Sequence, residues 1–372
     1  MTLDWAPVYD VVPRELFLPE VLWPSVEGRR LVVSKTDDPE EWYRWAYTDV
    51  PLITQWDDGG PLRAGADRGD LATSSSSMPS VVFSMLADLS VFESAKVLEI
   101  GTGTGWCAAL LSARLGEDNV VSVEIDEEVA ETARKALAAA GWHPKVLLGE
   151  GLQGMPERAP YDRVLVTAGV REVPCTWVRQ TRPGGVIVLP WGPDFTDQNA
   201  VVRLVVADDG SASGRFTGPV RFMHVRSQRV SWAFSDYLPD GDWPADTRES
   251  TTTLTETDVV TDDPFAAVDF VLGLLVPGCS HTVGRSPSGK QTMWLFGLRD
   301  RSWAATFFDE ENPSASRVYQ GGPRSLWDEV EAAYWWWVEQ GRPGHEEFGL
   351  TVTVDGRQEV WLGNPGDTVP TH

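Results

Sequence analysis

Short apolar runs alternate with longer amphipathic segments through the middle of the chain. The runs at residues 96–100, 120–124, 145–148, 163–166 and 186–189 have the length and composition of buried strands. Segments 106–115 and 127–140 have helical spacing, and the second opens with acidic residues, which favour a helix N-terminus. Because strands separated by helices indicate βαβ units, we predict an α/β fold with a doubly wound, mostly parallel sheet.

The flanking regions follow other patterns. Residues 56–73 are rich in Gly and Asp, which predicts a mobile loop, and a helical pattern at 81–89 follows a serine run. The Thr-rich segment 247–263 is typical of a linker or an edge strand. A helix is expected over 326–340 and a hairpin over 349–355 and 359–362. We therefore predict a first domain over 1–225, with an N-terminal subdomain over 1–90, and a smaller α+β domain over 226–372.

Composition narrows the function classes. The formal net charge of -24 repels phosphate, which argues against nucleic acid and anionic membranes and leaves a peptide as the easier partner, although solubility alone also explains such a surface. The three cysteines are far apart and have no metal-ligand spacing, so we expect no disulfide framework or metal site. No signal-peptide pattern precedes the first motifs, and the apolar run at 265–276 is too short to span a bilayer. We expect a cytoplasmic protein whose five scattered histidines are structural or exposed.

The sharpest chemical signal is the segment VLEIGTGTGW at residues 97–106. A predicted strand enters Gly101, Gly103 and Gly105, and a helix follows whose free N–H groups can face a ligand. A dehydrogenase loop, or a tight turn without a ligand, would look similar. Glu124 ends the next strand about 20 residues later, where an acid accepts ribose hydroxyl groups, unless it is simply a solvated surface acid.

Eight motifs then occur in a fixed order, and together they are specific. In them the chain resembles the protein-L-isoaspartate O-methyltransferase family over roughly residues 8–224. The resemblance implies a Rossmann-like class I methyltransferase fold with S-adenosyl-L-methionine as cofactor. The motifs are VPRELFLPE (12–20), AYTDVPLIT (46–54), SSSSMPS (74–80), VLEIGTGTGW (97–106), VVSVEID (120–126), GEG (149–151), APYDRVLV (159–166) and PGGVIVLPWG (183–192).

The resemblance also assigns site residues by position. The implied active-site serine is Ser77, with the neighbouring hydroxyls of Ser75 and Ser76. A carboxylate substrate is already ionised at neutral pH, so no general base is required. The family pattern is interrupted at 55–73, on the substrate side. The implied cofactor residues are Glu99, Gly101, Thr102, Gly103, Gly105, Glu124, Ile125, Glu150 and Gly151.

The region beyond residue 225 bears on which substrate we expect, a ribosomal peptide precursor or isoaspartyl residues. With this extension the chain resembles the family branch associated with ribosomal peptides such as graspetides and lanthipeptides. That reading predicts esterification of an aspartate side chain in a cyclised precursor, after which the ester closes to an aspartimide. The alternatives are an isoaspartate repair methyltransferase and a non-catalytic peptide-binding relative. The tryptophans of this region form either part of a peptide groove or a core or dimer interface.

Overall fold

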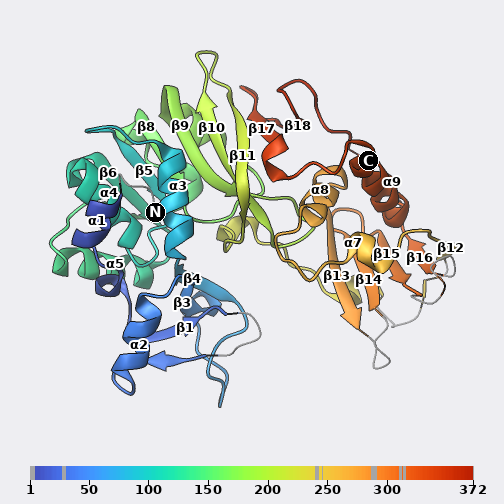
Figure 1. Ribbon diagram of the computed structural model, residues 1–372, viewed down its shortest axis with the longest axis horizontal. Helices are drawn as coiled ribbons and strands as arrows, with labels where there is room; N and C mark the ends of the chain where they lie inside the picture. The colour runs from blue at the N-terminus through green and yellow to red at the C-terminus, as the bar shows by residue number, and fades with distance from the viewer. Residues whose placement is uncertain are drawn as a thin grey trace.

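The computed structural model describes residues 5–26, 31–238, 243–244, 246–285, 291–309, 312 and 316–371 (Figure 1). Within these residues the chain forms a four-stranded N-terminal sheet, a nine-stranded central sheet and a five-stranded C-terminal sheet. The N-terminal sheet, drawn in blue, and the C-terminal sheet, drawn in orange, lie on different sides of the central one (Figure 1).

The central sheet confirms the predicted α/β fold. Its strand order is β18-β17-β11-β10-β9-β8-β5-β6-β7, and the chain reverses direction across the sheet at β5, which lies between β6 and β8. The sheet is mixed, because four antiparallel strands follow the five parallel ones. The strands that precede the C-terminal domain are β5 (Val97–Ile100), β6 (Val120–Glu124), β7 (Lys145–Leu148), β8 (Tyr161–Val166), β9 (Thr181–Trp191), β10 (Asn199–Val206) and β11 (Ala212–Val220).

Both faces of the inner parallel strands, such as β5 and β6, are buried, which explains why they are apolar without alternation, whereas the edge strand β7 is partly exposed. In β5, Val97 points to one core, while Leu98 and Ile100 point to the other. Helix α6 (Cys175–Gln180) covers the second face. The first face is covered by α1 (Ala6–Val11), α3 (Pro79–Leu89), α4 (Trp106–Leu115) and α5 (Glu127–Ala139).

The N-terminal subdomain packs helix α2 (Pro39–Ala46) on its antiparallel sheet. Asp38 caps this helix by accepting a 2.9 Å hydrogen bond from the Glu41 N–H. The segment predicted as a mobile loop is closed at its base, because the Asp57 carboxylate accepts the backbone N–H groups of Asp70 and Leu71. The strands are β1 (Val21–Pro24), β2 (Val33–Ser34), β3 (Leu52–Trp56) and β4 (Ala72–Ser76).

The C-terminal domain packs helices against one face of an antiparallel sheet. Helix α9 (Leu326–Glu339) lies where the apolar pattern predicts a helix, and the Thr-rich segment contains the edge strand β12 (Arg248–Thr251). In the described part of the chain no helix is long and apolar enough to cross a bilayer. The remaining elements are α7 (Glu256–Val259), α8 (Ala267–Leu275), β13 (Cys279–Arg285), β14 (Gln291–Gly297), β15 (Trp303–Phe307) and β16 (Arg317–Gly321).

The last hairpin leaves the C-terminal domain and rejoins the central sheet. It consists of β17 (Phe348–Val352) and β18 (Gln358–Leu362), close to the predicted positions. We expected it within the smaller domain, but β17 pairs with β11 in antiparallel register. The C-terminal domain is therefore an insertion between two neighbouring strands of the central sheet.

One core crosses the boundary between the two domains. The rings of Trp191 and Phe216 lie 5.7 Å apart, and both contact Phe270 of α8, at 6.4 and 5.2 Å. The apolar cluster of the second sheet face thus continues into the C-terminal domain. Such shared aromatic packing fixes the two domains in one arrangement.

Candidate active site

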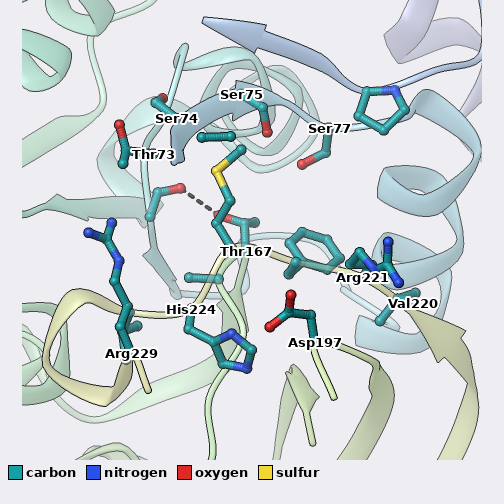
Figure 2. Close-up of a pocket in the computed structure, with 18 of the residues that line it drawn as sticks. Thr73, Ser74, Ser75, Ser77, Thr167, Asp197, Val220, Arg221, His224 and Arg229 are labelled. Carbon is teal, nitrogen blue, oxygen red and sulfur yellow. Dashed lines mark hydrogen bonds between the residues drawn. The ribbon is translucent and has the colours of Figure 1, made fainter. Parts of the chain in front are cut away.

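A cavity of about 1290 Å³ lies where the three parts of the molecule meet (Figure 2). Its walls come from the serine segment, from the loops after β5, β6 and β8, and from the first residues of β13. Ligands of doubly wound sheets bind at this place, beyond the carboxyl ends of strands whose order reverses.

The glycine loop after β5 forms one wall and tolerates no side chain at two positions. Gly101 has a φ of +93°, and a Cβ there would lie 2.8 Å from the Thr167 Oγ1. Gly105 precedes α4 with a φ of +87°, and a Cβ there would lie 3.2 Å from the Leu137 Cγ. The bare backbone leaves a cradle at the start of a helix, which suits a nucleoside ligand.

Glu124 organises the edge of this cradle. Its side chain is 8% exposed, and its carboxylate accepts the N–H of Gly103 at 2.9 Å and that of Ile125 at 3.0 Å. Ile125 presents an apolar side chain, 40% exposed, to the cavity wall. A carboxylate beside an apolar surface supplies what the ribose and the base of a nucleoside require.

Of two further predicted residues, Glu150 lines the cavity, whereas Glu99 is fully buried behind the cradle and does not line it. The buried Glu99 accepts a hydrogen bond from Ser122, whose hydroxyl lies 2.6 Å from the Thr102 Oγ1, and burial raises the pKa of Glu99 to about 7. Glu150 is exposed and accepts the Leu152 N–H at 3.2 Å. Gly103 and Thr102 complete this part of the wall, and Gly151, where a Cβ would lie 2.7 Å from Ile100, lines it too.

The serine segment lies directly above the glycine loop. A Cβ on Gly103 would lie 3.3 Å from the carbonyl oxygen of Ser75. The side chains of Ser75 and Ser77 point into the cavity (Figure 2). Ser76 differs, because it is 2% exposed and its hydroxyl accepts a hydrogen bond from Arg14, so that hydroxyl holds the wall rather than facing a substrate.

Two arginines that the sequence analysis did not single out form ion pairs with Asp58. They hold the Gly- and Asp-rich segment 56–73 close to the loop after β6. Arg226 joins Asp58 at 3.0 Å to Asp126 at 2.6 Å, and Arg229 contacts Asp58 at 2.8 Å. Burial alone would raise the pKa of Asp126, but the Val129 N–H and Arg226 lower it below its ordinary value. We name this cluster the arginine clasp.

Two of the five histidines, which we expected to be structural or exposed, also line the cavity. Burial, with the nearby Arg171, lowers the pKa of His224 to about 4, and burial lowers that of His281 to about 4. Both rings are therefore neutral at physiological pH. His281 Nδ1 lies 3.0 Å from the carbonyl oxygen of Phe195, so the start of β13 is fixed against the central sheet. No spacing in the sequence indicates either position.

Comparison with known proteins decides the family. The model of the protein-L-isoaspartate(D-aspartate) O-methyltransferase family matches residues 38–230, just over half of the chain. The chain belongs to this family. A protein-L-isoaspartate O-methyltransferase of Thermococcus onnurineus is 37% identical over 182 residues, which are 48% of this chain and 74% of that protein. The corresponding protein of Opitutus terrae is 36% identical over 186 residues, 50% of this chain and 71% of the relative.

The likeness in fold extends further than the likeness in sequence. A solved protein-L-isoaspartate O-methyltransferase matches 98% of this chain and 96% of its own, with a TM-score of 0.53 and 21% identity. The fold of the C-terminal domain therefore recurs in that protein. The family and its fold make this chain a class I protein carboxyl O-methyltransferase, and S-adenosyl-L-methionine is its cofactor. The glycine cradle, Glu124 and Ile125 fit that cofactor.

Proposed function

We propose that the protein methylates the free α-carboxylate of isoaspartyl residues in peptides and proteins. The observation that carries this proposal is the position of the serine segment, whose Ser75 carbonyl oxygen lies against the glycine loop. Hydroxyl groups for a carboxylate and a cradle for the cofactor thus face the same cavity. The family relationship points to the same reaction.

The chain's own contribution is binding, orientation and exclusion of water. Bound S-adenosyl-L-methionine supplies an electrophilic methyl group, and its transfer to a carboxylate oxygen gives a methyl ester and S-adenosyl-L-homocysteine. Because the carboxylate is ionised at neutral pH, no proton has to be removed. Ser75 and Ser77 donate hydrogen bonds to the oxygen that does not react, and the serine segment covers the reacting atoms.

The expectation of a dedicated, cyclised ribosomal precursor rested on the C-terminal domain and on the altered segment 55–73. The domain by itself does not indicate a dedicated precursor, because a solved isoaspartate methyltransferase shares the fold over nearly the whole chain. The arginine clasp holds the altered segment 55–73 beside the cofactor side of the cavity. This position fits a methyltransferase that accepts many polypeptides as well as it fits one with a single precursor. We therefore propose isoaspartyl residues as substrates, not a single precursor.

The test uses two peptides of identical sequence, one with an isoaspartyl and one with an aspartyl residue. Mass spectrometry after incubation with S-adenosyl-L-methionine should show a methyl group on the isoaspartyl peptide only. The Ser77→Ala variant should slow that gain while still binding the cofactor. Methylation of the aspartyl peptide alone would overturn the proposal.

A further inference from the structure

The C-terminal sheet turns one face toward the cavity and away from its helices. Helices α8 and α9 lie on the other side of the sheet (Figure 1). Thr282 of β13 lines the cavity, and the register then places Trp294, Ala305 and Tyr319 beside one another on the next three strands. Cross-strand partners share a face, so this row runs directly from the cavity wall across the sheet.

Aromatic side chains from the segment before β12 lie over this face, cover Phe296 and Ala305, and form its outer surface together with rings of the strands. Three of them are substantially exposed: Phe234 at 41%, Trp243 at 43% and Phe307 at 39%. Contiguous exposed aromatic surface is uncommon on a protein and marks a binding surface. We define the aromatic face as Trp232, Phe234, Trp243, Trp294, Phe307 and Tyr319.

Ring contacts connect the cavity to the far end of the face. Trp232 lines the cavity and stacks on Phe296 at 4.1 Å. Phe234 packs on Trp294 at 4.7 Å. Trp243 stacks on Tyr319 at 5.0 Å and on Trp294 at 6.0 Å. The face is thus continuous with the active site, and any chain leaving the cavity on the β13 side meets it.

We propose that the aromatic face binds an extended segment of the substrate polypeptide next to the methylated residue. This inference rests on the proposed function, because it takes the substrate to be a polypeptide. The flat rings offer a large contact area at a small cost in conformational entropy. The formal net charge of -24 favours segments with basic residues, which also bind aromatic rings.

The size of the face sets the length of the segment. The row from Thr282 to Tyr319 crosses three inter-strand spacings, about 14 Å. An extended chain covers that length with about five residues. A hexapeptide with isoaspartate as its fourth residue places at most three residues beyond the cavity and leaves part of the face empty, whereas the same peptide with ten further residues, lysine and leucine among them, on each side covers it.

The experiment measures KM and kcat for the hexapeptide and the extended peptide. We expect the wild type to have about tenfold lower KM for the extended peptide, and Trp243→Ala and Phe307→Ala each to remove several-fold of that advantage. Neither substitution should change kcat or the KM for the hexapeptide. Trp335→Ala is the matched control, because Trp335 is 45% exposed and lies on α9, on the other side of the sheet. Thermal unfolding confirms that each variant is folded.

Several outcomes would overturn the inference. They are equal KM values for the two peptides, equal effects of Trp243→Ala and Trp335→Ala, or a wild-type dimer that Trp243→Ala dissociates without changing either KM. Titration calorimetry with the extended peptide carrying aspartate in place of isoaspartate tests the face without catalysis. Binding that Trp243→Ala weakens supports the aromatic face even when neither peptide is methylated, an outcome that would overturn only the proposed function. Absence of binding, with methylation of the hexapeptide intact, would overturn the aromatic face alone.

Discussion

Arg14 Nε donates a 2.9 Å hydrogen bond to the hydroxyl of Ser76, 62 residues further along the chain. The guanidinium is completely buried and also donates to the carbonyl oxygens of Ser76 and Ser77, each at 2.9 Å, and of Val50 at 3.0 Å. Burial lowers its pKa to about 10, so it stays charged at neutral pH. One buried cation thus holds the backbone that presents Ser77.

Replacing Arg14 should disturb the serine segment more than the cofactor site. Arg14→Met leaves several buried carbonyl groups without a donor, which we expect to cost about 2–4 kcal/mol of the free energy of unfolding. At temperatures where the variant is folded, kcat should fall while the affinity for S-adenosyl-L-homocysteine is retained. Arg63→Met, which removes an exposed ion pair with Asp70, is the control. Equal melting temperatures for the two variants would contradict this role.

Glu124 should determine cofactor affinity. Glu124→Ala removes a buried acceptor of the Gly103 N–H and the proposed acceptor of the ribose hydroxyls. Loss of hydrogen bonds to a charged group costs about 1.5–3 kcal/mol, so affinity should fall about 10- to 100-fold. Calorimetry with S-adenosyl-L-homocysteine measures it. Glu127→Ala, three residues away and exposed, should bind like the wild type, and a similar loss there would point to general electrostatics instead.

The serine hydroxyls should act on the reaction rate. Ser75→Ala and Ser77→Ala should each lower kcat for an isoaspartyl peptide by roughly tenfold or more, because each removes one hydrogen bond to a charged oxygen. Cofactor affinity should not change. Ser80→Ala, in the exposed first turn of α3, is the control. Wild-type kcat in both variants would remove these hydroxyls from the proposed site.

Asp269 of α8 should make stability depend on pH. Burial raises its pKa to about 7, with Arg221 opposing, and its Oδ1 has no hydrogen-bond partner among the described residues. Because this pKa lies above the unfolded value of about 3.9, the folded state binds more protons between the two values. Stability relative to Asp269→Asn should therefore fall as the pH rises from about 4 to about 7 and stay level above.

Denaturant unfolding of both proteins at several pH values measures this difference. His224 and His281 have lowered pKa values and so contribute the opposite slope, which is gained as the pH rises from about 4 toward 6.5. Both proteins contain these histidines, so their contribution cancels. A difference between the two proteins that is constant over the whole pH range would contradict the prediction.

The parallel strands and the glycine loop could be predicted because local pattern alone specifies them. Buried strands such as β5 are apolar throughout, and Gly101 and Gly105 are required by backbone geometry. The contacts of Arg14 could not, since they join residues 32 to 63 positions apart. The arginine clasp likewise joins Asp58 to Arg226 across a Gly- and Asp-rich segment whose composition indicates only a loop.

The tryptophans show the same limit. The sequence left them between a peptide groove and a core or dimer interface, and on α9 both environments occur, because Trp327 is 1% exposed and Trp335 is 45% exposed. The exposed Trp243 stacks on rings 51 and 76 residues away, those of Trp294 and Tyr319, so no local pattern could place it. Tertiary contacts decided its environment.

The pairing of β11 with β17 has a consequence for synthesis of the protein. Residues 212–215 of β11 pair with residues 349–352 of β17. The whole C-terminal domain must therefore be translated before this edge of the central sheet finds its partner. Until then β11 presents unpaired backbone groups to other chains. During synthesis the central sheet is therefore nearly complete but has one unpaired edge strand. The yield of folded protein in the cell should depend on how quickly the final hairpin pairs with β11, or on a chaperone that covers β11 until then.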